Sequence, residues 1–451
     1  MTFNMRATLL FAFVAVLFVL EGTTTVWIFS GSWNTSLGIL NMALISAIMA
    51  LGVNLQWGFA GLFNVGIMGF VALGGLATVL VSMPPSPGGF AAGGLGIISG
   101  LLMGAATLFV AIYAYGHMPK GRTRTLAMLA ILIVGFFVYR AIFDPAVAAV
   151  EAITPASTGN LGGLNFGDPA TYKERGWVTL LSWPVGGILA AGAAWIVGKA
   201  ALGLRSDYLA IATMGVAEIC VAILKNEDWL SRGVKNIIGI PRPVPYEVDL
   251  QNTPSFVERA ASFGLDPTTA STIYVKLLYG VLFAAVLLFI LWLAERALKS
   301  PWGRMMRAIR DNEVAAEAMG KDVTRRHLQI FILGSAVCGI AGAMMTTIDS
   351  QLTPGTYQPL RFTFLIWVMV ILGGSGNNFG SVLGAFLVWW LWVQVEPMGL
   401  WLSDTLTAGL ADDNWFRIRM QDAAAHMRLF TMGLLLLVVL RFSPRGLIPE
   451  K

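Results

Sequence analysis

The chain has 451 residues, of which 56% are hydrophobic and only 12% are charged, and its formal net charge is +5. Soluble domains carry roughly 25% charged residues, so this composition excludes an ordinary soluble enzyme and predicts a polytopic membrane protein. A modest excess of Lys and Arg is typical of the cytoplasmic loops of such proteins, and we predict no nucleic-acid partner from it. Two cysteines in apolar runs, Cys220 and Cys338, and three scattered histidines predict neither a disulfide nor a metal site.

Apolar segments follow one another along almost the whole chain and leave no room for a large soluble domain. A bilayer core of about 30 Å needs about 20 apolar residues per helix, and some of the segments are short enough to be re-entrant or broken. We therefore predict a single membrane domain, residues 1–451, with an all-α fold of about ten to twelve transmembrane or re-entrant helices. The segments are 7–29, 37–57, 61–81, 93–115, 126–143, 177–202, 208–224, 273–293, 328–348, 362–372, 379–395 and 429–440.

The first segment follows Arg6 in the layout of a signal peptide. Glu21 and Gly22 do not form a small-residue cleavage site, so we predict an uncleaved first membrane helix.

Two Gly-rich stretches, 57–75 and 372–384, interrupt helices in the two halves of the chain. Transporter helices break in this way along the substrate path. Close packing of small residues explains the glycines equally well.

Basic residues cluster around Lys120, from Lys199 to Arg205, from Arg304 to Arg326, and from Arg441 onward. If the spans alternate, all four clusters fall on one side, which the positive-inside rule makes cytoplasmic, with both termini inside. The opposite side then receives residues 144–176 and a large loop, 225–272, with a short helix expected over 255–263. A passive loop and a partner-binding surface fit this large loop equally well.

The polar segment 301–331 is unusual in so apolar a chain, and its pattern predicts two short helices. Trp302, Met305, Met306 and Ile309 recur at helical spacing while Arg304, Arg307 and Arg310 point elsewhere, which is typical of an amphipathic helix ending near Asp311. Asn312 is then a predicted N-cap for a second helix, Gly320 a left-handed C-terminal cap, and Thr324 the start of the next span. From the pattern alone, contact with lipid headgroups and docking of a partner are equally good interpretations.

Few polar residues lie within the apolar runs, and these are the candidates for a substrate path. Glu218 stands out because an ionisable group inside a membrane is costly, although pairing with a helix end or a position near the surface also explains it. Hydrogen bonds between helices explain Asn54 and Asn64 equally well. The candidates are Asn54, Gln56, Asn64, Thr213 and Glu218, with Asp349 near the end of a span.

Five stretches in collinear order resemble LivM-type permease subunits of branched-chain amino acid importers of the ATP-binding-cassette (ABC) class. They are LGVNLQWGFAGLFNVGIMGFVALGG, SDYLAIATMGVAEI, AIRDNEVAAEAMGKDVTRRHLQIF, VILGGSGNNFGSVLGA and FSPRGLIP. The resemblance implies an ABC importer permease fold, with residues 301–327 as a cytoplasmic coupling segment and 225–272 as a large periplasmic loop. It also implies that six residues sit in a cleft of an ATPase subunit, namely Asp311, Asn312, Glu313, Ala315, Ala316 and Gly320.

The same resemblance implies partners: a second, LivH-like permease subunit, two cytoplasmic ATPase subunits and a periplasmic substrate-binding protein, all at the bilayer of a bacterial inner membrane. One departure is SRGVKNIIGIPRP, where Arg232, Lys235 and Asn236 replace residues that are usually small or glycine in the family. The resemblance implies branched-chain amino acids as the substrate, and this departure leaves urea, short amides and other small amino acids open as alternatives.

The sequence contains no GxxxxGK[ST] pattern, so we expect no ATP site of that type, no cofactor and no enzymatic activity in this chain, with ATP hydrolysed by partner subunits. An ion-coupled secondary transporter would need buried carboxylates, for which Glu218 is the best candidate. A membrane-embedded enzyme would need clustered His, Asp and Glu, and the sequence shows no such cluster.

Overall fold

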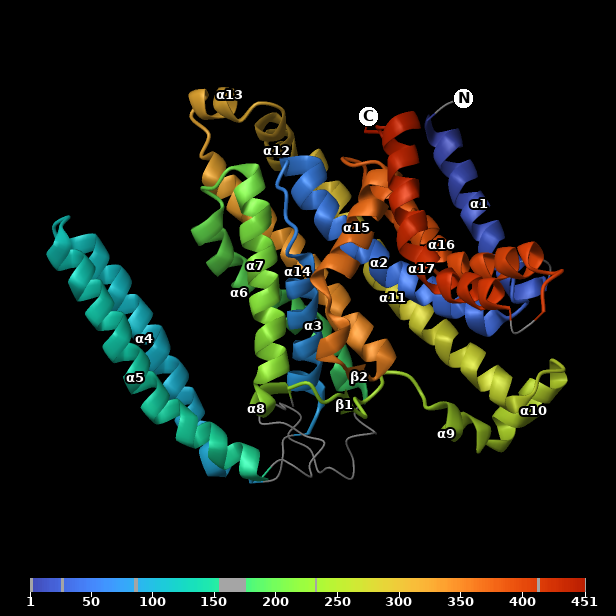
Figure 1. Cartoon of the computed structure of the whole chain (residues 1–451), viewed down its shortest axis with the longest axis horizontal. Coiled ribbons are helices and arrows are strands. Elements are labelled where there is room, and N and C mark those ends of the chain that lie inside the picture. Colours follow the sequence, from blue (N-terminus) through green and yellow to red (C-terminus); the bar gives the residue numbers. More distant parts are fainter. Residues whose placement is uncertain are drawn as a thin grey trace.

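The computed structural model describes residues 3–25, 28–84, 88–153, 176–231, 233–411 and 414–450, and it is an all-α membrane protein (Figure 1). The elements in chain order are α1 (Phe3–Thr23), α2 (Trp33–Ala60), α3 (Ile67–Ser82), the π-helix η1 (Phe90–Gly94), α4 (Leu95–His117), α5 (Arg122–Ile153), α6 (Thr179–Ala201), α7 (Ser206–Asn226), α8 (Asp228–Ser231), β1 (Ile237–Ile238), α9 (Glu247–Gln251), α10 (Pro254–Ser262), α11 (Pro267–Lys299), α12 (Pro301–Asp311), α13 (Glu313–Ala318), α14 (Val323–Asp349), β2 (Gln351–Leu352), the 3-10 helix η3 (Pro354–Thr356), α15 (Pro359–Gly373), α16 (Asn378–Leu406) and α17 (Trp415–Phe442).

Each of the predicted apolar segments coincides with a helix. Among the described residues, 9 helices are long and apolar enough to cross a membrane. A further span is bent by 57° within α17, between Trp415–Ala424 and His426–Phe442, and Ile67–Ser82 and Phe362–Gly373 are shorter apolar helices. The expected set of transmembrane and shorter helices is therefore confirmed.

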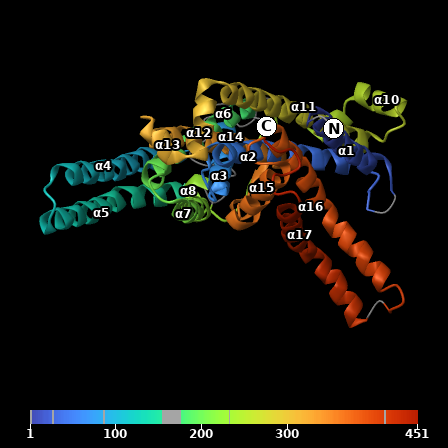
Figure 2. The same cartoon turned by 90° about the horizontal axis from the view of Figure 1, so that it is seen from above.

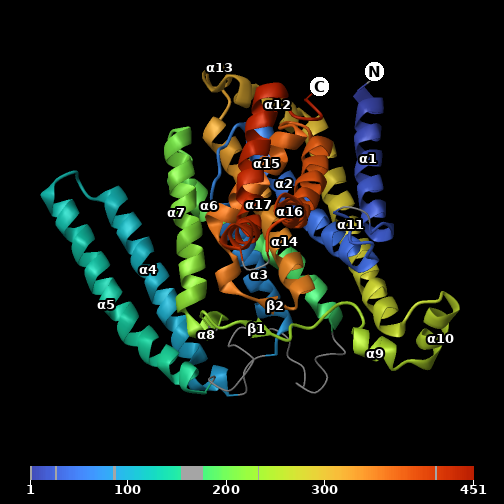
Figure 3. The same cartoon turned by 45° about the vertical axis from the view of Figure 1, so that its right-hand side comes forward.

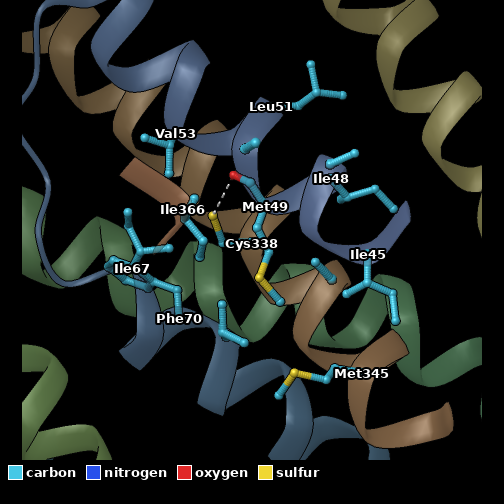
Figure 4. Close-up of a cluster of buried hydrophobic side chains, with 14 of the residues drawn as sticks. Ile45, Ile48, Met49, Leu51, Val53, Ile67, Phe70, Cys338, Met345 and Ile366 are labelled. Atoms are coloured by element: carbon cyan, nitrogen blue, oxygen red, sulfur yellow. Dashed lines mark hydrogen bonds between the residues drawn. The ribbon is translucent and has the colours of Figure 1, made fainter. Parts of the chain in front are cut away.

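The core lies where α2, α3, α6 and α14 pack against one another. Small residues let these helices approach closely: a side chain added at Gly74 of α3 would run into the carbonyl group of Gly339 of α14. Figure 4 shows the apolar side chains that fill the centre, including Cys338, whose thiol lies 3.8 Å from the Met49 carbonyl oxygen. Cys338 is buried, Cys220 is half-buried and both are free, as predicted.

The α4–α5 hairpin stands apart from this core (Figure 2). At its inner end Phe143 packs on Trp229 of α8, with ring centroids 5.8 Å apart. The predicted boundary at Phe143 is wrong, because α5 continues to Ile153. The ion pair between Arg140 and Asp144, one turn apart and 2.6 Å in length, supports this continuation. The remainder of the predicted loop, 154–175, lies outside the described residues.

The polar elements gather at two opposite ends of the helical bundle (Figure 3). One end carries α12, α13 and both ends of the chain, and the other carries α8, β1, β2, α9 and α10. There β1 pairs antiparallel with β2, Ile237 opposite Leu352. The short helix expected over 255–263 is confirmed as α10.

Candidate functional site

The polar segment begins with α12, whose apolar side is buried against the rest of the chain. Met306 and Ile309 are 0% and 1% exposed, and the helix packs on α2 and α11. The predicted amphipathic helix ending at Asp311 is therefore confirmed. Its apolar face is covered by the helices of this chain and is not free to lie on lipid.

The cap residues that connect α12, α13 and α14 are largely those expected. The Asn312 side chain accepts a hydrogen bond from the Ala315 amide at 3.0 Å and caps α13. Gly320 has a φ of +75°, a left-handed conformation that suits glycine. The expected start of α14 at Thr324 is slightly wrong, because Asp322 accepts a hydrogen bond from the Arg325 amide at 2.9 Å and the helix begins at Val323.

The turn of α13 forms an exposed tip at one end of the molecule (Figure 1). Two apolar side chains on it, Val314 and Met319, are 75% and 79% exposed. Of the six predicted coupling residues, Ala316 is half-buried and the other five, Asp311, Asn312, Glu313, Ala315 and Gly320, are exposed. An apolar surface that projects beyond the membrane-spanning helices is typical of a site that a partner covers.

Arg310 does not point away from the protein as its helical position predicted. Its Nη1 donates hydrogen bonds to the Gly58 carbonyl oxygen at the end of α2, at 2.5 Å, and to Glu450, at 2.8 Å, and its Nε donates to Asp311 at 3.0 Å. Burial by itself lowers the pKa of Arg310, but the hydrogen bonds and charges of Glu450 and Asp311 raise that pKa above its ordinary value. Arg310 is therefore fixed in place as a charged group that connects three parts of the chain.

Glu450 belongs to a C-terminal strap of turns and bends, residues 443–450, which lies along the break between α15 and α16. The amides of Leu447 and Ile448 donate to the carbonyl oxygens of Leu372 and Gly373 at 2.8 and 2.9 Å. Gly374 in this break has a φ of +118°, which strongly favours glycine. The second Gly-rich stretch is thus a real helix break, and the strap joins it to the polar segment.

Asn54 of α2 holds the same break from the inside. Its Oδ1 accepts from the Gly376 amide at 2.9 Å, and its Nδ2 donates to the Asn378 side chain at 3.0 Å. Asn378 in turn donates to Glu295 of α11 at 3.0 Å. A continuous set of hydrogen bonds therefore links α2, the α15–α16 break and α11.

Gln56 and Asn64 hold the first break, between α2 and α3, together with Thr213 of α7. The Gln56 amide donates to the Phe331 carbonyl oxygen of α14 at 2.9 Å, and the Asn64 amide donates to Gln56 at 2.9 Å. The Thr213 hydroxyl accepts from the Val65 amide at 3.1 Å. Four of the predicted polar residues therefore line the two helix breaks, Asn54 at one and Gln56, Asn64 and Thr213 at the other. All four are buried, and each forms a hydrogen bond to another element.

Glu218 is not brought together with the other four residues. It lies on the exposed side of α7, in agreement with the alternative of a position near the surface, and its part in a substrate path stays a prediction. Among the described residues the buried carboxylate is that of Glu21, 1% exposed, which accepts from Gln394 at 2.5 Å and from the Ser30 hydroxyl at 2.7 Å. The position of Glu21 at the end of an apolar run gave no signal in the sequence.

An apolar pocket of about 240 Å³ opens beside the α2–α3 break. Phe63 and Trp367 meet at its wall with ring centroids 4.7 Å apart, and Met214 contributes from α7. One polar group, the Thr363 hydroxyl, lines the pocket without a hydrogen-bond partner among the described residues. The pocket can accept an apolar group and offers one hydroxyl to a polar atom.

No group of three or more His, Cys, Asp or Glu side chains that could hold a metal ion occurs in the described part of the chain. Arg232, one of the departures in the large loop, lies outside the described residues.

Comparisons with known proteins place these features in a family. The family model described as "Branched-chain amino acid transport system / permease component" matches residues 146–440. The high-affinity branched-chain amino acid transport system permease protein LivM of Escherichia coli (strain K12) is 29% identical over 231 residues, 51% of this chain and 53% of its own length. The probable LivM of Methanocaldococcus jannaschii is 31% identical over 176 residues, 38% of this chain and 48% of its own.

The fructose import permease protein FrcC of Rhizobium meliloti is 26% identical over 150 residues, 31% of this chain and 41% of its own length. The chain spans about half the length of the LivM relatives that it matches. No solved structure matches it. Because the family model covers more than half of its residues, including α13 and the α15–α16 break, the chain belongs to the permease components of branched-chain amino acid transport systems.

Proposed function

We propose that this chain is the transmembrane permease subunit of an ABC importer, that it forms part of the substrate path, and that residues 301–327 couple this path to a separate ATPase. The observation that carries the proposal is the exposed tip at α13. Val314 and Met319 project there from a capped turn, at the end of the molecule that also carries the basic clusters. A lipid-facing role does not need such a capped turn.

The contacts behind the tip support a transmission route. A force on α13 acts on α12, because Asn312 both ends α12 and caps α13. Arg310 passes the displacement to the end of α2 and, through Glu450, to the strap. Both contacts lead to the helix breaks, where Asn54 and Gln56 hold the neighbouring spans. ATP-driven movement of the tip would thus shift the broken helices together.

The apolar pocket supports branched-chain amino acids as the substrate class, because it fits the branched side chain of such a substrate. The charged ammonium and carboxylate groups of the amino acid would have to lie outside the pocket, since they lose their water on binding and need polar partners. The pocket beside the first break offers aromatic and aliphatic side chains with a single hydroxyl. We assign substrate-path roles to Asn54, Gln56, Asn64 and Thr213 as residues that shape this break, whereas Glu218 would take part only at a surface shared with a second permease subunit.

Orientation and partners complete the proposal. The end with α12 and α13 faces the cytoplasm of a bacterial cell, whose inner membrane the chain spans, and both termini are cytoplasmic. Two ATPase subunits hydrolyse the ATP, and this chain itself carries no enzymatic site. The loop 225–272 at the opposite end would meet a periplasmic binding protein, beside a LivH-like second permease. An ion-coupled transporter is less well supported, since Glu218 is exposed and the buried Glu21 carboxylate is already hydrogen-bonded to Gln394 and Ser30.

Co-purification with candidate ATPase subunits tests the docking. Glu313→Arg should release the ATPase subunits, because it reverses a charge on the exposed tip. Glu258→Arg is the matched control, since it makes the same change on the exposed side of α10 at the opposite end. ATPase retention by the Glu313 variant equal to that of the control would exclude the proposed docking surface.

Uptake selectivity tests the pocket. Met214→Asp places a carboxylate in the apolar wall, where an unpaired charge is strongly unfavourable. The variant should lower the rate of leucine uptake at least tenfold relative to the wild type and leave ATPase binding unchanged. Leucine uptake at the wild-type rate would remove the pocket from the substrate path.

A further inference from the structure

A large cavity lies between the first half of α1 and the ends of three other elements, at the same end of the molecule as α12. Its volume is about 990 Å³, and it is separate from the apolar pocket and from the exposed tip. Ala7, Phe11, Ala12 and Ala15 of α1 form an apolar wall. The other wall comes from the end of α11, the start of α16, and Arg307 of α12. The cavity is therefore apolar on one side and charged on the other.

The charged groups that line this cavity, two carboxylates and two basic side chains, are unevenly paired. Lys299 lies 3.3 Å from Glu295, and Glu450 lies 2.8 Å from Arg310, so both carboxylates have a basic partner. Arg307 has no acidic partner among the described residues and is half-buried at the cavity wall. Arg304 and Arg307 also line a second, polar cavity of about 540 Å³ that shares Glu450 with the first. A guanidinium held in this position favours an anion with several oxygen acceptors.

We propose that this cavity binds an anionic phospholipid, with its phosphate on Arg307 and an acyl chain along the apolar wall of α1. Three observations select this occupant. The charged end lies at the level of the basic clusters, where the polar surface of a membrane would be. The apolar end runs along a membrane span of which only 22% is buried within the chain. Small residues at Ala12 and Ala15 leave room for a chain of methylene groups.

This assignment gives two arginines of α12 separate roles. Arg310 is occupied inside the protein, whereas Arg307 faces the cavity. The lipid would thus fill the space beside the contact between Arg310 and Glu450, and its loss would loosen α1 from α11 and α16. The proposal does not depend on the substrate or on the ATPase partner.

Native mass spectrometry of the full chain, released from detergent after titration with phosphatidylglycerol or phosphatidylcholine, tests the site. We expect one phosphatidylglycerol to be retained in preference to phosphatidylcholine. Arg307→Gln should weaken the apparent affinity for phosphatidylglycerol about tenfold, the effect of losing one charged hydrogen bond. Arg325→Gln is the charge-matched control, since Arg325 is exposed on α14 and does not line the cavity.

A second variant separates the apolar wall from the charge. Ala12→Trp fills the cavity from α1 and should reduce retention of both lipids while leaving the unfolding temperature unchanged, because Ala12 is exposed outside the helix packing. Equal retention of the two lipids by the wild type, or unchanged phosphatidylglycerol binding in Arg307→Gln, would overturn the proposal. A dimer peak that these variants abolish would also overturn it, since it would show that a second copy of the chain fills the cavity.

Discussion

The contact between Arg310 and Glu450 joins α12 to the C-terminal strap. A double-mutant cycle on this pair tests whether the contact contributes to the free energy of unfolding. The two side chains are 24% and 29% exposed, so the ion pair is only partly screened by solvent. Arg310→Gln leaves Glu450 with no basic partner and also removes the hydrogen bond to Gly58, which should lower the free energy of unfolding by about 3 kcal/mol. Glu450→Gln keeps an oxygen acceptor and should cost about 1 to 2 kcal/mol.

The two changes should not be additive, because each removes the same interaction. We expect a coupling free energy of about 1 to 2 kcal/mol, measured by unfolding of the full chain in mixed micelles of increasing denaturing detergent. Arg310→Gln combined with Glu258→Gln is the control cycle, since Glu258 lies at the opposite end of the molecule. A coupling of the Arg310 and Glu450 changes within about 0.5 kcal/mol of zero, as in the control, would show that the strap and α12 are independent.

Other predictions concern the backbone and the helix breaks. Gly74→Ala should lower the free energy of unfolding by about 1 to 3 kcal/mol, because the added methyl group meets the backbone of α14, whereas Gly192→Ala, with nothing within 4 Å, should be neutral or slightly stabilising. Asn54→Ala should cost about 1 to 3 kcal/mol in the same measurement, because it leaves the Gly376 amide buried without its acceptor, and an unchanged value would contradict the assigned hydrogen bond. Gly320→Ala should weaken ATPase binding without a steric clash, since φ is +75° and nothing lies within 4 Å; equal binding would show that the turn tolerates another conformation.

The helices and their caps could be predicted from the sequence because their causes are local. The length of each hydrophobic run is enough to predict the apolar helices, and the caps Asn312 and Gly320 are recognisable from residue type and spacing. The end of α5 was misplaced because Asp144 and Pro145 look like loop residues, whereas the ion pair to Arg140 and the apolar residues that follow continue the helix to Ile153.

The role of Arg310 and the exposure of Glu218 depend on contacts that the sequence does not encode locally. Arg310 is 140 residues from Glu450, and its helical position groups it with two arginines that point elsewhere. Glu218 lies in a predominantly apolar helix, and its periodicity does not distinguish a packed face from a lipid-facing or partner-facing one. The polar residues of the two breaks were identifiable, but their partners on α14, α16 and α11 were not.

Coupling between the exposed tip and ATP hydrolysis is the most direct measure of what this chain does. In vesicles containing the chain, its second permease, candidate ATPase subunits and the substrate-binding protein, leucine-stimulated ATP hydrolysis would be compared between the wild type and Val314→Asp, which changes the apolar tip without touching the helix breaks. We predict that the variant loses at least nine-tenths of the stimulation, roughly a tenfold effect, while the chain keeps its unfolding temperature. Full stimulation in the variant would contradict the docking of an ATPase at α13.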